Sequence, residues 1–280
     1  MVSLTDSTRQ TAAWSILMHA VFQKKQPITI PDWKMFPCND DVKTPQDHIP
    51  VSYCEGAADE PHLFYLPSEY DTSEDLAAMF DALKSLKFSL FCCDYGSLWQ
   101  KNEHIAIEAV CESTTAALQS VSSWMDEHGR KGPLVVMGRS IGSALAIHTA
   151  ACMCQRTACL VVESGFDKTI ELLQKMGKNT EGLSDPFSNR AKMRTYTKPV
   201  LFLHSSRDEY VSITQVEWLV MESRSKTTQF QVVPSPGRNN VFSSTSEFYL
   251  QALKDFIYLR MGRRPKLKRH MNASSNGMGI

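Results

Sequence analysis

The chain has 280 residues, of which 42% are hydrophobic and 21% charged, and its 30 Lys and Arg residues balance 30 Asp and Glu residues. This composition is typical of a globular protein and excludes a chain that is too polar to bury a core. The zero formal charge excludes a global field that would attract nucleic acid, so no nucleic-acid partner is expected.

The first predicted element is a helix that ends at Phe22. Residues Ala12 to Phe22 are mostly apolar, but Ser15 and His19 interrupt the run, which is much shorter than the roughly 20 residues that a membrane span needs. The flanking residues lack the basic start and the small-residue cleavage site of a secretory signal. We therefore expect a packed helix, no membrane span and a cytoplasmic protein.

The eight cysteines contain no C-x-x-C pair, and most of them lie inside apolar runs. Such cysteines are expected to be buried, reduced thiols, which agrees with a reducing compartment. No motif in the sequence calls for a metal ion, and no cofactor is expected.

Short apolar runs rich in β-branched and aromatic residues predict strands that are covered on both faces. These runs are His62–Leu66, Phe88–Cys93, Leu134–Gly138, Ala158–Glu163, Val200–His204 and Phe230–Val233. Segments with apolar residues at helical spacing alternate with them, namely Ser73–Ser85, Glu103–His128, Ile141–Cys154, Lys168–Met176, Ile213–Glu222 and Thr245–Met261. The alternation predicts an α/β fold with a mostly parallel central sheet and helices on both faces.

Three parts of the chain are expected. Residues 1–57 form an N-terminal extension with a helix and an antiparallel edge pair that includes Pro50–Cys54, and residues 58–262 form the α/β domain. Residues 263–280 are expected to be a disordered tail. Six basic residues and no acidic ones lie between Arg260 and His270. A solvated tail is the simpler interpretation, and a weak contact with phosphates or acidic lipid is the alternative.

The most informative stretch is Gly138-Arg139-Ser140-Ile141-Gly142, where a predicted strand runs directly into a helix. This is the G-x-S-x-G pattern in the strand-turn-helix context that it requires. Such an elbow holds the central residue in a strained backbone conformation and lifts its side chain above the sheet, so the residues two before and two after it must be small. The pattern predicts Ser140 as a nucleophile and the Ile141 N–H, at the helix N-terminus, as an oxyanion donor.

With this elbow, the sequence from Pro61 to Met261 resembles the α/β-hydrolase superfamily, in particular bacterial serine hydrolases and esterase-like proteins with a G-R-S-x-G-S elbow. The resemblance implies that fold, and hydrolysis of a carboxylic ester or thioester through Ser140. It also implies a small cap between Phe166 and Lys198, which favours small ligands.

The acid of the catalytic triad is also suggested by the resemblance. The stretch Pro199–Val211 is similar to the superfamily's P-x-L-x-x-H-G-x-x-D-x-x-V, and it assigns that acid to Asp208. The alternative interpretation of Asp208 is a turn or ion-pair residue. Glu163, at the end of the preceding strand, is the reserve acid.

The sequence departs from the superfamily at the histidine of the triad. Relatives usually read P-G-x-G-H-N there, whereas this chain reads Val233-Pro-Ser-Pro-Gly-Arg-Asn-Asn-Val241, which places Arg238 at the histidine position. Arginine stays protonated because its pKa lies above about 12, so it cannot serve as the general base. The other histidines belong to other elements, and His204 is expected to be a packing residue.

A second departure follows the first strand of the resemblance. Relatives read H-G-N or H-G-G, whose N–H groups complete the oxyanion hole, but this chain reads Phe64-Tyr-Leu-Pro-Ser-Glu69. Proline has no N–H to donate, so Pro67 at the donor position would remove half of the hole. The loss of one such donor costs on the order of 3 kcal/mol in kcat.

Three hypotheses follow from these residues. The chain is a serine hydrolase with an unidentified base, or a catalytically inactive relative that works as a binding or interaction protein, with Arg238 and Asp208 closing the triad space as an ion pair. In the third, Arg238 faces Ser140 and the site holds a carboxylate or phosphate. The expected partner is thus a small ester, thioester or anionic ligand, and the sequence leaves the oligomeric state open.

Overall fold

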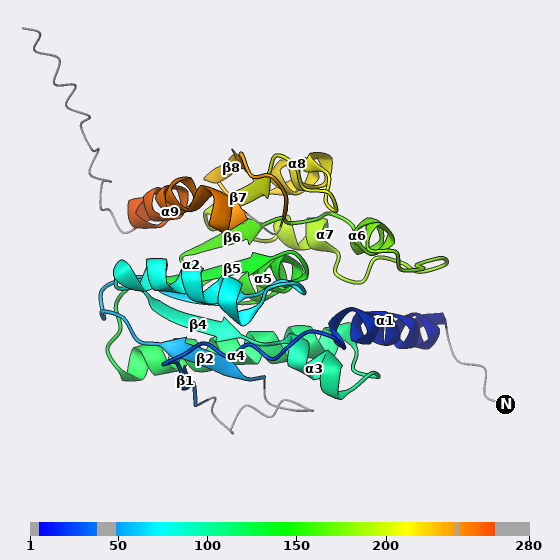
Figure 1. Ribbon diagram of the computed structural model, residues 1–280, viewed down its shortest axis with the longest axis horizontal. Helices are drawn as coiled ribbons and strands as arrows, with labels where there is room; N and C mark the ends of the chain where they lie inside the picture. The colour runs from blue at the N-terminus through cyan, green and yellow to red at the C-terminus, as the bar shows by residue number, and fades with distance from the viewer. Residues whose placement is uncertain (1–5, 38–48, 239–240, 261–280) are drawn as a thin grey trace, which may run out of the picture.

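The computed structural model describes residues 6–37, 49–238 and 241–260 (Figure 1). The basic tail predicted for 263–280 lies outside the described residues. The strands are β1 Lys34–Met35, β2 Val51–Cys54, β3 His62–Leu66, β4 Ser89–Cys93, β5 Leu134–Arg139, β6 Cys159–Glu163, β7 Val200–Ser205 and β8 Thr228–Val233. The helices are α1 Asp6–Phe22, α2 Ser73–Ser85, α3 Gly96–Lys101, α4 Ile107–Glu127, α5 Ile141–Cys152, α6 Thr169–Lys175, α7 Asn189–Met193, α8 Ile213–Glu222 and α9 Val241–Arg260.

The strands form one sheet in the order β1-β2-β4-β3-β5-β6-β7-β8. The pairs β1–β2 and β2–β4 are antiparallel, as predicted for the Pro50–Cys54 edge, and the remaining pairs are parallel. Because β3 and β5 are neighbours in the centre of the sheet, the loop after β3 lies beside the turn after β5. The topology therefore brings Glu69 and Ser140, which are far apart in the sequence, to one edge.

Side chains alternate between two cores, one on each face of the sheet. In β5, Val136 belongs to the core that also contains residues of α1, α3, α4, α5, α6, α7 and α8, whereas Val135 and Met137 belong to the core formed with α2 and α9. Every residue of β3, β4, β5, β6 and β7 is buried, which explains why these strands read as continuous apolar runs.

The N-terminal helix is part of the main core. Trp14, Met18 and Phe22 of α1 are buried, and the ring of Phe22 stacks on Trp99 with 5.1 Å between the ring centroids. Between β6 and β7, the segment where the small cap was predicted contains only the short helices α6 and α7 (Figure 1). No helix among the described residues is long and apolar enough to cross a membrane.

Candidate active site

Ser140 lies at the turn between β5 and α5, with φ 55° and ψ −124°. This conformation requires the two glycines that flank it. A Cβ atom on Gly138 would lie 2.2 Å from the carbonyl oxygen of Gly142, and one on Gly142 would lie 2.2 Å from the carbonyl oxygen of Leu66. Small residues at both positions thus allow the start of α5 to contact β3 in a tight strand-to-helix turn, as the G-x-S-x-G pattern requires.

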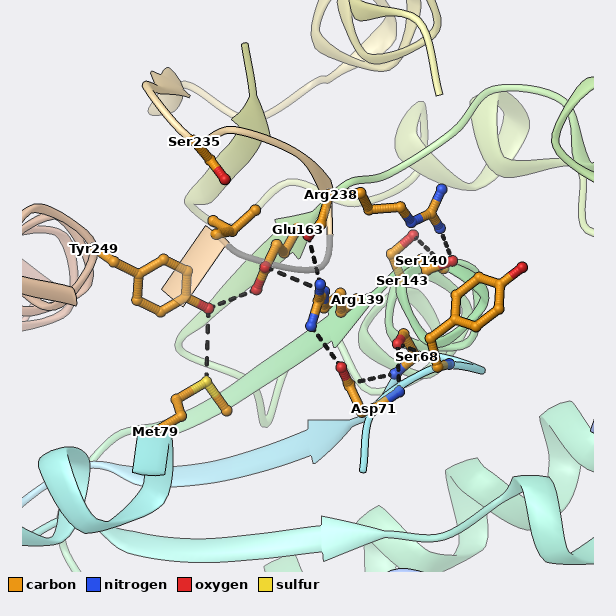
Figure 2. A network of polar contacts seen from close by, with 12 residues as sticks. Ser68, Asp71, Met79, Arg139, Ser140, Ser143, Glu163, Ser235, Arg238 and Tyr249 are labelled. Carbon is orange, nitrogen blue, oxygen red and sulfur yellow. Dashed lines mark hydrogen bonds and ion pairs between the residues drawn. The ribbon is translucent and has the colours of Figure 1, made fainter. Parts of the chain in front are cut away.

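The side chain of Arg238, the residue predicted at the histidine position, is fully buried. Its Nη2 donates a hydrogen bond to Oγ of Ser140 (Figure 2). Its Nη1 lies 3.7 Å from Oδ1 of Asp208. The structure therefore brings together three residues singled out in the sequence, Ser140, Asp208 and Arg238. They form a serine–arginine–aspartate arrangement, which contains no imidazole that could accept the serine proton.

Asp208 has the local geometry of a turn residue. Its Oδ1 accepts hydrogen bonds from the N–H groups of Tyr210 (3.0 Å) and Val211 (2.9 Å), and its Oδ2 lies 4.0 Å from Nδ1 of His204. The Nε2 atom of His204 is 3.1 Å from the carbonyl oxygen of Val211, and burial lowers the pKa of His204 despite the nearby carboxylate. His204 is thus a neutral packing residue behind Asp208.

Sequence reasoning did not identify Glu69, which lies in the loop after β3. Oγ of Ser140 donates to Oε1 of Glu69 at 2.7 Å, and the Ile141 N–H donates to Oε2 at 3.3 Å. The Glu69 carboxylate thus occupies the place where an oxyanion would accept from Ile141. The sequence contained one indication of its role, because Glu69 is the last residue of the stretch Phe64–Glu69, which departs from the superfamily pattern. However, a loop carboxylate ordinarily faces solvent.

The Pro67 carbonyl also faces the elbow. Its oxygen accepts a hydrogen bond from the Tyr95 hydroxyl at 2.5 Å and would lie 2.5 Å from a Cβ atom on Gly142. Pro67 therefore closes the loop against α3 and α5 and contributes no N–H group to the site.

Glu163, the reserve acid, belongs to a neighbouring buried network centred on Arg139 (Figure 2). Arg139 donates to Oδ1 of Asp71 at 2.5 Å and lies 3.4 Å from Oε1 of Glu163, whose Oε2 accepts from the Tyr249 hydroxyl at 2.5 Å. Burial raises the pKa of Glu163. Through its side chain, Glu163 contacts Arg139 and Tyr249 and not Ser140.

Two hydrogen bonds join the networks. Nη2 of Arg139 donates to the carbonyl oxygen of Arg238 at 2.5 Å, and the Ser140 N–H donates to the carbonyl oxygen of Glu163 at 3.0 Å. A cavity of about 380 Å³ lies on the other side of Arg139, between α2 and the start of α9. No group of three or more His, Cys, Asp or Glu residues within the described ranges is arranged to hold a metal ion. In this part of the chain, no histidine hydrogen-bonds to Ser140.

The strand order and the arrangement of the helices define this chain as an α/β-hydrolase-fold protein, as predicted from the sequence. No protein-family model matches the chain. Solved structures that it resembles include an esterase of Pyrococcus furiosus, Pf2001, with a TM-score of 0.63, 14% identity and coverage of 83% of this chain and 98% of the esterase.

Two further solved structures resemble the chain. Est1E from Butyrivibrio proteoclasticus has a TM-score of 0.60 and 14% identity, and the match covers 82% of this chain and 99% of Est1E. A structure from work on the metagenome-derived lipolytic enzymes LipS and LipT has a TM-score of 0.56 and 14% identity, over 75% of this chain and 97% of the other. At these identities the comparisons show the fold.

Proposed function

We propose that this chain is a hydrolase-fold binding or interaction protein that does not hydrolyse esters through a serine–histidine–acid triad. The observation that carries the proposal is the position of Glu69, whose carboxylate accepts from both Ser140 Oγ and the Ile141 N–H while Arg238 contacts the same serine. A substrate carbonyl needs the place that Glu69 holds, and the serine needs a base that Arg238 cannot be.

A serine hydrolase of small esters or thioesters is the second candidate. The elbow conformation of Ser140 and the inward-facing Ile141 N–H favour it, and within the described part of the chain Glu69 is the group that accepts the hydrogen bond from the serine hydroxyl. However, the same carboxylate cannot act as base and leave the oxyanion place free. Once Glu69 moves away to admit a carbonyl, Ser140 keeps only Arg238 as a neighbour, so this candidate is the weaker one.

A fluorophosphonate probe, with p-nitrophenyl acetate as substrate, tests the proposal. We expect the wild-type protein to show no more labelling and no more turnover than Ser140→Ala. The positive control is the double variant Arg238→His/Glu69→Gly, which restores an imidazole and empties the oxyanion place, and in which we expect labelling at Ser140. Labelling of the wild-type protein at Ser140 would establish the hydrolase instead.

We also propose a cytoplasmic location. The support is that all seven described cysteines are free, and that four of them, Cys92, Cys93, Cys111 and Cys159, are buried. Free thiols are typical of proteins in a reducing compartment. A redox-sensitive reporter fused to the protein and read in cells would test the location.

A further inference from the structure

The Glu69 carboxylate occupies a complete receptor for a carboxylate. Its oxygens accept from Ser140 Oγ at 2.7 Å and the Ile141 N–H at 3.3 Å, and Oε1 lies 3.4 Å from Nη2 of Arg238. The donors belong to the β5–α5 turn and to the loop after β8, whereas Glu69 belongs to the loop after β3. The receptor is therefore built independently of the group that fills it.

The receptor has more donors than Glu69 uses. The guanidinium of Arg238 is fully buried, yet among the described residues its Nε has no hydrogen-bond partner, and its Nη1 has only the 3.7 Å ion pair with Asp208. Buried donors without acceptors are costly, and arginine binds carboxylates best with two parallel hydrogen bonds. A carboxylate that is free to choose its orientation can engage Arg238 more fully than Glu69, which is tethered to its own loop.

The loop that carries Glu69 is held in place by its backbone. The Pro67 carbonyl accepts from Tyr95, the Ser68 carbonyl accepts from Lys25, and the Ser68 N–H donates to Asp71 at 2.7 Å. Exchange of the occupant thus requires rotation of side chains and no rearrangement of this loop's backbone. Replacing one carboxylate by another also keeps the charge of the site constant, so no buried charge is left unpaired.

Two tyrosines cover the receptor on its solvent side. The rings of Tyr70 and Tyr210 lie 6.0 Å apart, and Tyr70 is 39% exposed. The guanidinium carbon of Arg238 lies 5.6 Å from the centre of the Tyr210 ring. The receptor therefore lies beneath a pair of aromatic side chains, which can change rotamer without a change in the backbone.

We propose that the Ser140 site binds a short carboxylic-acid anion in exchange for the Glu69 side chain. This inference rests on the proposed function, because it treats the site as a receptor and not as a catalyst. The internal carboxylate competes with the ligand, so the apparent affinity is the intrinsic affinity multiplied by the fraction of time that the site is free of Glu69. Acetate matches the atoms that Glu69 carries beyond its Cβ.

Acetate binding, followed by ¹³C NMR line broadening and by thermal unfolding against sodium chloride at equal ionic strength, tests the proposal. We expect weak, saturable binding to the wild-type protein and at least tenfold tighter binding to Glu69→Ala. Arg238→Lys keeps the charge but not the forked pair of donors. We therefore expect Glu69→Ala/Arg238→Lys to bind acetate at least tenfold more weakly than Glu69→Ala.

Glu69→Gln keeps the volume of the side chain but removes its charge. It is the variant to use for the binding measurement if Glu69→Ala does not fold. It is expected to bind acetate more tightly than the wild-type protein. No acetate-specific effect in a folded variant, or an effect that persists in Glu69→Ala/Arg238→Lys, would overturn the inference. Neither result depends on labelling by the fluorophosphonate, so failure of the receptor and failure of the proposed function are separate outcomes.

Discussion

The elbow at Ser140 depends on the close approach of α5 to β3, and Gly142 is the residue that permits it. A methyl group at position 142 would meet the carbonyl oxygens of Leu66 at 2.2 Å and Pro67 at 2.5 Å. Both are backbone atoms in the centre of the fold, and neither can rotate away. An added Cβ atom therefore has less room at position 142 than at the glycines of the surface turns.

Gly142→Ala is expected to lower the free energy of unfolding by about 1–3 kcal/mol, because the added methyl group forces backbone atoms apart. Urea unfolding followed by circular dichroism would measure the change. Gly237→Ala is the matched control, since its new Cβ would find only the Glu209 carboxylate at 3.4 Å, and we expect a change within about 0.5 kcal/mol. Equal effects in both variants would contradict the close approach.

Asp71 and Glu163 flank Arg139 with opposite shifts in pKa. Burial raises the pKa of both groups, but for Asp71 the charges of Arg139 and Lys25 and the hydrogen bonds from Ser68 outweigh burial, so its pKa is lowered. For Glu163, burial prevails over the Arg139 charge and the Tyr249 hydrogen bond, so its pKa is raised. The two carboxylates should therefore contribute to stability with opposite dependence on pH.

Asp71→Asn tests the lowered pKa. Ionised Asp71 stabilises the fold above its unfolded pKa of about 3.9, and this contribution is lost as the pH falls toward the lower folded pKa. We expect the variant to be less stable than wild type by about 2–3 kcal/mol at pH 7, with a deficit that shrinks below about pH 4. Urea unfolding at several pH values measures it, and a deficit independent of pH would contradict the assignment.

Glu163→Gln is expected to behave in the opposite way. The raised pKa means that the folded protein favours protonated Glu163, so this stabilisation is present below the unfolded pKa of about 4.3 and declines as the pH rises through the folded pKa. The variant should therefore gain stability relative to wild type as the pH increases from about 4 to 7. The same urea series would measure the sign of the slope, and a relative loss over this interval would argue against it.

At the scale of elements, α1 is fixed to the domain by one aromatic cluster. Phe22 stacks on Trp99 at 5.1 Å and meets Tyr95 edge-on at 5.6 Å, and all three rings are buried. The residues that follow α1 reach the site, because Lys25 donates to the carbonyls of Ser68 and Asp71. Packing of α1 therefore supports the loop that carries Glu69.

Phe22→Ala should destabilise the protein by about 3–5 kcal/mol, which is the range for removing a fully buried phenylalanine. Ile16→Ala, in the same helix but at a residue that is 54% exposed, is the control and should cost less than about 1 kcal/mol. Chemical denaturation of the two variants gives the comparison. A small effect of Phe22→Ala would mean that α1 does not contribute to the cooperative unit.

Most of the sheet was predictable because its strands are buried on both faces and read as apolar runs. The short helix α3 and the two-residue strand β1 were not predicted, since neither is long enough to show a period. The last helix begins at Val241 and not at the predicted Thr245, whose φ of −140° marks a kink inside it. Hydrogen bonding of the Thr245 side chain to the Val241 carbonyl accompanies that kink.

The candidate site was predictable only in part, because some of its contacts join residues that are far apart in the sequence. Ser140 and Ile141 follow from a local motif, in which five adjacent residues dictate the turn. Glu69 meets them only because β3 and β5 are neighbours in the sheet, and no local pattern encodes that pairing with Ser140. Arg238 was singled out by its place in the sequence, but its contact with Glu69 needed the three-dimensional arrangement.

At the scale of the whole molecule, the sheet separates two cores that must form together, because each of the strands β3, β4, β5, β6 and β7 contributes side chains to both. The reactivity of the native cysteines can test this arrangement without any mutation. Cys92 and Cys159 belong to the core under α2 and α9, and Cys93 and Cys111 belong to the other core, whereas Cys152 is exposed.

Labelling of the native protein with a thiol reagent, followed by peptide mass spectrometry, should therefore modify Cys152 rapidly. Cys92, Cys93, Cys111 and Cys159 should react only on the timescale of global unfolding, and the four rates should converge. Addition of urea below the unfolding midpoint is the control, since it should accelerate all four together. Separate rates for the two cores would show that one face of the sheet opens without the other.

The contact between Arg238 and Glu69 has a consequence for how this sequence can change over generations. Each side chain is almost completely buried. Replacing Arg238 alone removes the cation beside the buried Glu69 carboxylate, and replacing Glu69 alone leaves Arg238 the 3.7 Å pair with Asp208. Removing one partner of a buried ion pair costs about 3–5 kcal/mol. Loss of the pair therefore requires two coordinated substitutions, because the single-step intermediates consume much of the 5–15 kcal/mol by which proteins are stable. The pair therefore opposes any single substitution at either residue, including replacement of Arg238 by histidine.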